Sequence, residues 1–155
     1  MLPAGELEFI MKFLCELGYD AQYCRQVVPG WWRWPVDFWN YELDIYIQID
    51  GHCHWYGMRG CSSSRVQQRD LRFNKEAVKH NARVVRVHSA DLVNQQQIQA
   101  CLDAVAVGYR IVLSPAYATQ CINPFGCRIG YVAAMRQQLP HCCFVTDNYG
   151  NTLIR

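Results

Sequence analysis

The sequence predicts an α/β protein in which a mixed central sheet is flanked by helices, with the order α-β-β-α-β-α and a cysteine-rich C-terminal extension. Three observations carry this prediction. Residues 43–50 alternate apolar and polar side chains, residues 65–82 have the spacing of an amphipathic helix, and Val84-Val85-Arg86-Val87 is a β-branched run. Because the chain has 155 residues, we expect these segments to share one domain.

The other elements follow from periodicity and from turn and cap residues. They are a helix over 5–17 ended by Gly18, an irregular stretch over 19–34, a hairpin of 36–38 with 43–50 that turns at Asn40, a loop over 57–64, a helix over 92–107 capped by Ser89-Ala90-Asp91, a strand over 110–113, a short helix over 131–138 and a terminal hairpin of 143–146 with 152–154. We divide the chain into a core over 1–115 and an extension over 116–155 that packs on the same domain.

The composition narrows the location of the protein. Hydrophobic residues make up 51% of the chain, but no apolar run is long enough for a membrane span. The N-terminus lacks a basic leader followed by an apolar stretch, which predicts an intracellular protein of the cytoplasm or nucleus. Nine cysteines, an odd number without an export signal, predict free and mostly buried thiols or metal ligands rather than disulfides.

Charge is unevenly distributed along the chain. No Lys or Arg lies between Trp34 and Met58, whereas the segment from Arg59 to Arg86 is strongly basic. An acidic site beside a basic flank is the layout expected when a polyanion is held against a metal centre. The contacts with nucleic acid that we expect from this flank, with a solvated helix face as the alternative, are Arg59, Arg65, Arg69, Arg72 and Lys75.

The hairpin predicts a metal site. Its turn brings Asp37 beside Gln48 and Asp50 on one face of the sheet. Like charges at that range repel unless a cation intervenes, so Asp37 and Asp50 are candidate ligands of Mg²⁺ or Mn²⁺. His54, just beyond the strand, is a candidate general acid or base because histidine titrates near neutral pH. Glu8 either joins this cluster or complements the dipole of the first helix.

Aromatic residues are the other candidate contacts. Trp31-Trp32-Arg33-Trp34 places three indoles in four positions, and they cannot all be core on one strand face. At least one, with Trp32 as the candidate, is expected to stack on a base or line a groove. Packing over the hairpin is the alternative.

Several motifs occur in a definite order: a helix carrying Glu8, Val36-Asp37-Phe38, a hairpin, a strand that ends Ile-Asp-Gly-x-x-His, a helix with Arg-Asp, and Arg-Val-x-Arg-Val over residues 83–87. Together they resemble the restriction-endonuclease-like PD-(D/E)xK superfamily, and most of all the very short patch repair endonuclease group. The resemblance covers about residues 6–92. It implies a restriction-endonuclease-like core and metal-dependent hydrolysis of phosphodiester bonds in DNA.

The resemblance assigns roles to individual residues. Asp37 stands at the family's first metal-binding aspartate, and Gln48 with Asp50 stands at its (D/E)xK element. Glu8 matches a helical glutamate, and His54 matches a histidine close to the scissile phosphate. Gln48 replaces an acidic residue, and an amide ligates a cation without contributing charge. A degenerate nuclease fold that binds nucleic acid or a protein partner without cutting is therefore the alternative function.

The same resemblance implies further contacts. Trp55 and Tyr56 resemble aromatic residues that wedge into DNA, with packing against the loop as the alternative. Asp70 either contributes to the site or lies at a helix start, and we favour the helix start. A structural Zn²⁺ is implied nearby, although the candidates do not reproduce a Cys-x₂-Cys pair; they are His52, Cys53, His54 and Cys61. Thiol chemistry at Cys53 is a third alternative, and DNA and a second copy of the chain are the expected partners.

Overall fold

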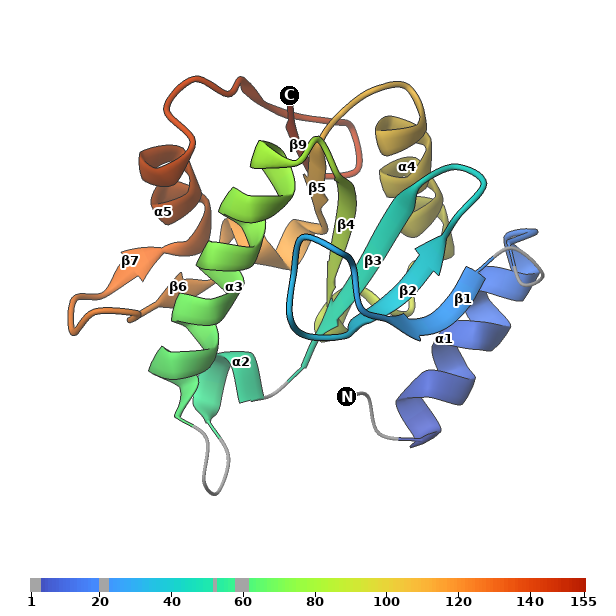
Figure 1. Cartoon of the computed structure of the whole chain (residues 1–155), viewed down its shortest axis with the longest axis horizontal. Helices are drawn as coiled ribbons and strands as arrows, with labels where there is room; N and C mark the ends of the chain where they lie inside the picture. Colours follow the sequence, from blue (N-terminus) through green and yellow to red (C-terminus); the bar gives the residue numbers. More distant parts are fainter. Residues whose placement is uncertain (1–3, 20–22, 52, 58–61) are drawn as a thin grey trace.

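The computed structural model describes residues 4–19, 23–51, 53–57 and 62–155 (Figure 1). None of the helices it describes is long and apolar enough to cross a membrane. The elements in chain order are α1 (Ala4–Glu16), β1 (Tyr23–Val27), β2 (Val36–Asn40), β3 (Ile45–Asp50), α2 (Cys53–Tyr56), α3 (Ser63–Lys79), β4 (Arg83–His88), the 3-10 turn η1 (Ser89–Asp91), α4 (Gln95–Ala106), β5 (Ile111–Leu113), the 3-10 turn η2 (Pro115–Ala118), β6 (Cys121–Ile122), β7 (Ile129–Gly130), α5 (Tyr131–Gln138), β8 (Phe144–Thr146) and β9 (Thr152–Ile154).

Seven strands form one mixed sheet in the order β1-β2-β3-β4-β5-β9-β8. The pairs β3–β4 and β4–β5 are parallel, because α3 and α4 carry the chain back across the sheet between them. The other pairs are antiparallel. The predicted terminal hairpin of β8 with β9 is present and joins the sheet beside β5, so C-terminal residues belong to the same sheet as the β2–β3 hairpin.

Helices cover both faces of the sheet. Ile47 and Ile49 of β3 pack with α1 and α4 in one core. Tyr46, on the same strand, packs with α3 and α5 in a second core. Because successive strand residues point to opposite faces, Gln48 and Asp50 face the α3 side. Figure 1 shows α3 in front of the sheet, with α5 and the β6–β7 hairpin at one end of the molecule and α1 at the other.

The turn predicted at Asn40 is confirmed and sets the register of the β2–β3 hairpin. The buried Asn40 side chain accepts hydrogen bonds through Oδ1 from the N–H groups of Glu42 and Leu43, at 3.0 and 3.1 Å. An Asn side chain that caps its own turn in this way fixes the turn geometry. The register that follows places Asp37 opposite Gln48.

Among the elements that differ from the sequence prediction are β1 and α4. Residues 23–27, predicted to be irregular, form the edge strand β1, which pairs with β2. The prediction was wrong because the run Tyr-Cys-Arg-Gln-Val lacks the alternation that signals a strand. The helix expected from Leu92 begins at Gln95. Asn94 supplies its cap, accepting a hydrogen bond from Gln97 N–H at 3.1 Å, and Ser89–Asp91 form a 3-10 turn instead.

The cysteine thiols whose burial the structure describes are less buried than predicted. Cys101 is buried, Cys142 is half-buried, and Cys121, Cys127 and Cys143 are exposed. Burial raises the pKa of the Cys101 thiol well above its ordinary value, so this thiol is a neutral core group. The cysteines of the C-terminal segment are mostly surface groups.

Candidate functional site

The β2–β3 hairpin joins Asp37 to the backbone of β3. Asp37 N–H donates to Gln48 Oε1 at 2.9 Å, and Asp37 Oδ2 accepts a hydrogen bond from Ile49 N–H at 2.8 Å. The predicted approach of Asp37 to Gln48 is therefore confirmed. The Gln48 amide oxygen serves here as a hydrogen-bond acceptor for the neighbouring strand.

The carboxylate of Asp37 is in an environment that disfavours negative charge. Burial raises the pKa of Asp37 to about 6, against the hydrogen bond from Ile49 N–H, and the charge of Asp50 raises it further. Asp37 is half-buried rather than fully enclosed. A positive charge close to this carboxylate would remove much of the penalty for keeping it ionised.

Asp50, at the end of β3, is fully buried and already has a cationic partner. Arg86 of β4 donates to both of its oxygens, from Nε to Oδ2 at 2.8 Å and from Nη2 to Oδ1 at 2.7 Å. Tyr117 O–H donates to Oδ2 as well. Burial alone would raise the pKa of Asp50, but Arg86 and then His54 lower it below its ordinary value. Asp50 is therefore a stable anion.

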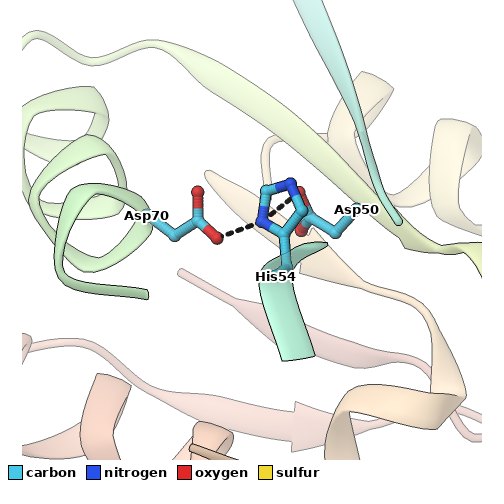
Figure 2. A group of neighbouring side chains, drawn as sticks. All are labelled: Asp50, His54 and Asp70. Carbon is cyan, nitrogen blue, oxygen red and sulfur yellow. Dashed lines mark hydrogen bonds and ion pairs between the residues drawn. The ribbon is translucent and has the colours of Figure 1, made fainter. Parts of the chain in front are cut away.

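His54 stands between two carboxylates (Figure 2). Its Nδ1 lies 2.5 Å from Asp70 Oδ2 and 3.5 Å from Asp50 Oδ1. Asp50 comes from the end of β3, His54 from α2 and Asp70 from α3, and one ligand atom from each residue lies within 4.8 Å of the others. This spacing is close enough for the three side chains to share a proton or a cation.

The expectation that Asp70 lies at a helix start is wrong. α3 begins at Ser63, so Asp70 lies about two turns into the helix. It is on the buried face of α3, where its Oδ2 lies 2.5 Å from His54 Nδ1 and its Oδ1 lies 3.2 Å from Arg86 Nη2. A carboxylate on the buried face of a helix requires polar or charged partners, and His54 and Arg86 are those partners.

A shell of polar side chains holds Arg86 in place. Arg86 Nη1 donates to Asn74 Oδ1 at 3.1 Å, and Asn74 Nδ2 donates to Tyr131 O–H oxygen at 2.9 Å. Two carboxylates and one guanidinium leave the cluster with one excess negative charge. A protonated His54 or a nearby cation would balance that charge.

Sequence reasoning missed Arg86 and the two tyrosines of this shell, Tyr117 and Tyr131. The sequence places Arg86 in the basic flank, yet its side chain is fully buried. The signal was present, because a charged residue inside the run Val84-Val85-Arg86-Val87 requires a buried partner. The tyrosines carry no comparable signal, because a tyrosine in an apolar segment does not by itself require a charged partner. Both also lie after residue 115, in the segment that sequence reasoning places outside the core.

Glu8 lies apart from the cluster. It is exposed on α1, and α1 packs against the core on the Ile47 and Ile49 side of β3. Gln48 and Asp50 point to the other side of the sheet. The structure therefore does not bring Glu8 to the acidic cluster. Glu8 is the fifth residue of α1, just beyond the first turn that the alternative assigned to it.

The predicted aromatic contacts separate into buried and exposed side chains. Trp55 is buried and stacks on His88 with ring centroids 4.8 Å apart, so it follows the packing alternative rather than forming an exposed wedge. Tyr56 is 74% exposed. Trp32 is half-buried, with its ring centroid 5.4 Å from that of Phe73.

The predicted basic contacts lie on the outer side of α3. Arg65, Arg72 and Lys75 are exposed and Arg69 is half-buried, whereas Arg59 lies outside the described residues. The zinc hypothesis also falls largely outside them, since it depends on His52, on Cys61 and on the side chain of Cys53. The prediction of zinc therefore stays a prediction.

Comparisons with protein-family models, with curated proteins and with solved structures gave no match to this chain. The class that the fold and the site define is accordingly broad. The protein has a mixed α/β sheet covered by helices, with a buried cluster of Asp50, His54 and Asp70 beside the half-buried Asp37.

Proposed function

We propose that the protein is a metal-dependent endonuclease that hydrolyses phosphodiester bonds in DNA, with the restriction-endonuclease-like core that its motifs resemble. The observation that carries this proposal is the state of Asp37. Its half-buried carboxylate has a pKa raised to about 6 by burial and by Asp50, and the backbone N–H of the same residue donates to Gln48 Oε1 at 2.9 Å. A carboxylate kept in so unfavourable a place is typical of a functional site.

The oxygen atoms around Asp37 suit Mg²⁺ or Mn²⁺. A divalent cation would be held by Asp37 and Asp50, with Gln48 Oε1 as a neutral oxygen nearby. The fit at Asp37 is good, because a cation relieves the penalty on its charge. At Asp50 the cation would share the carboxylate with Arg86, which already binds both oxygens. When bound, such an ion polarises a phosphoryl oxygen and lowers the pKa of a coordinated water.

The side chains of the cluster have separate tasks in this proposal. Asp70 holds the proton of His54 at Nδ1, so Nε2 is the nitrogen that exchanges a proton with the attacking water or the leaving group. Arg86 fixes the carboxylates of Asp50 and Asp70. We assign Asp70 to proton transfer rather than to the metal, because a cation there would displace the proton between Asp70 and His54.

Cleavage of closed circular plasmid tests the proposal. Purified protein with Mg²⁺ or Mn²⁺ should convert supercoiled DNA to nicked circles, and a chelator should stop the reaction. Asp37→Asn keeps an oxygen that accepts from Ile49 N–H but loses the charge, so nicking should cease while the fold is retained. Equal nicking by the wild type and by Asp37→Asn would refute the assignment.

The alternative, a nuclease fold that binds nucleic acid without cutting, is favoured by one observation. Arg86 already neutralises Asp50, and an amide at Gln48 adds no charge, so the protein itself supplies part of what a metal would supply. This alternative predicts DNA retention that weakens steeply with salt and no nicking with any divalent ion. The same plasmid assay, combined with a retention assay in chelator, separates the two functions.

A further inference from the structure

A groove lies between the turn that precedes β2 and the outer face of α3. Its volume is about 1020 Å³, and Figure 1 shows the loop between β1 and β2 beside α3. One wall is the segment from Gly30 to Trp34. The other wall is formed by side chains of α3 whose spacing puts them on one helix face: Arg65, Arg69, Arg72, Lys75 and Glu76.

The charge of the groove is strongly positive. Arg33 and the four cations of α3 face a single acid, Glu76, so five positive charges less one negative charge leave +4. Within the described part of the chain none of the five cations forms an ion pair, whereas Glu76 lies 3.5 Å from His80. Unneutralised cations at this density are complementary to a run of phosphates.

The aromatic wall combines two anchored rings and one exposed ring. Trp31 and Trp32 both pack against Phe73, with centroids 5.4 Å away in each case, and they join the core on the α3 side. Trp34 is 48% exposed, and the guanidinium carbon of Arg69 lies 6.0 Å from its ring centroid. A rigid wall therefore presents one indole beside a row of cations, which is how single strands are held.

The size of the groove indicates what kind of nucleic acid fits it. Its volume is at the upper end of the range for small-molecule pockets, about 300–1,000 Å³, which is the scale of individual nucleotides. Unpaired nucleotides fit. Glu76 is the sole acidic acceptor among the lining side chains, so recognition rests on backbone charge and stacking rather than on base edges.

The groove and the candidate site draw on the same two stretches of the chain, the segment that leads into β2 with its strand, and helix α3. Trp34 precedes Asp37 by three residues, in the segment that leads into β2, and Arg69 directly precedes Asp70 on α3. The opposite faces of α3 thus serve the two places: the buried face carries Asp70 and the outer face carries the cations.

From these observations the geometry points to a single-stranded DNA subsite, in which a base stacks on Trp34 and the adjoining phosphates lie on Arg65, Arg69 and Arg72. The inference rests on the proposed function for the identity of the nucleic acid. It makes the substrate a DNA with an unpaired segment beside the bond that is cut, such as a flap or a splayed end.

Binding measured in chelator tests the subsite apart from cleavage. The probe is a fluorescein-labelled oligothymidylate of about 12 nucleotides, followed by anisotropy. Trp34→Ala should weaken binding about 10-fold, and Trp34→Phe should recover most of it. The matched control is Tyr149→Ala, which removes a ring that is 50% exposed in the C-terminal hairpin loop and should leave affinity unchanged. Thermal midpoints of all variants should match the wild type.

A charge series separates phosphate contacts from stacking. Arg72→Ala should reduce the dependence of log affinity on log salt by about 0.7, the value for one phosphate of a single strand, while Arg128→Ala, which removes an exposed cation of the β6–β7 hairpin, should not. Inorganic polyphosphate should compete for the groove with an affinity that is the same in the wild type and in Trp34→Ala.

The subsite is refuted if blunt duplex of the same length binds as tightly as the oligothymidylate, or if Trp34→Ala and Tyr149→Ala have equal effects. If Trp34→Ala loses affinity for polyphosphate and for oligothymidylate equally, a base does not stack on Trp34. If oligouridylate binds more tightly than oligothymidylate, DNA is not the occupant. Trp34-dependent binding without nicking would leave the subsite standing and reject the nuclease. Nicking combined with binding that does not depend on Trp34 would reject the subsite and leave the nuclease standing.

Discussion

The guanidinium of Arg86 binds both oxygens of Asp50, with Nε 2.8 Å from Oδ2 and Nη2 2.7 Å from Oδ1. Asp37, the neighbouring acid on the same hairpin, forms no ion pair within the part of the chain that the structure describes. One acid is thus held by the fold and the other is exposed to charge repulsion. We therefore expect removal of the charge to change the stability of the protein in opposite directions at the two residues.

Asp50→Asn should destabilise the protein by about 3–5 kcal/mol, because it leaves Arg86 buried with its charge uncompensated. Urea unfolding followed by circular dichroism measures the loss. Asp103→Asn, which changes an exposed acid of α4, is the matched control and should be nearly neutral. If the two variants lose equal stability, the Asp50–Arg86 pair does not hold the fold.

Asp37→Asn should stabilise the protein by about 1–3 kcal/mol at pH 7, since the folded-state pKa of Asp37 is about 6 against an ordinary 3.8. The sign follows from proton binding: the folded wild type holds this proton more tightly than the unfolded chain. Wild type therefore gains stability as the pH falls from 6 to 4, and the difference from Asp37→Asn should vanish below about pH 4. A constant difference across this range would show that burial does not raise the pKa of Asp37.

Gln48→Glu adds a charge beside Asp37 while keeping the oxygen that accepts from Asp37 N–H. We expect lower stability without metal, by about 1 kcal/mol, and recovery with Mg²⁺. Plasmid nicking should rise. Gln96→Glu makes the same change on the exposed face of α4 and should alter neither property. A variant that binds Mg²⁺ no better than the wild type would favour the non-cutting alternative.

His54→Gln should lower the cleavage rate by about 10²–10⁴-fold with little change in DNA affinity, because it removes the group that exchanges the proton. Asp70→Asn should act in the same direction, since it removes the carboxylate that lies 2.5 Å from His54 Nδ1. Initial nicking rates across pH 5–9 measure both variants. Unchanged rates in His54→Gln would exclude it from the chemistry.

The elements with strong local signals were predictable from sequence. The Asn40 turn, the β2–β3 hairpin and α3 were predicted because alternation, helical spacing and turn residues agree there. β1 was missed because an edge strand without alternation has no local signal. The approach of Asp37 to Gln48 follows from hairpin register alone and was predicted for that reason.

The buried cluster was not predictable in the same way. Asp70, His54 and Arg86 come from α3, α2 and β4, and only the packing of α3 on the sheet brings them together. Tyr117 and Tyr131 reach the cluster from the C-terminal segment, which sequence reasoning placed outside the core. Tertiary packing of this kind leaves no spacing rule in the sequence.

The thermal midpoint measured across millimolar Mn²⁺ tests most directly whether Asp37 holds the catalytic cation. Wild type should become more stable as the Mn²⁺ concentration rises, because a ligand that binds only the folded state stabilises it. Asp37→Asn should begin at a higher midpoint and stay there as Mn²⁺ is added. A wild-type midpoint that does not move, or equal shifts in both proteins, would contradict a metal site at Asp37.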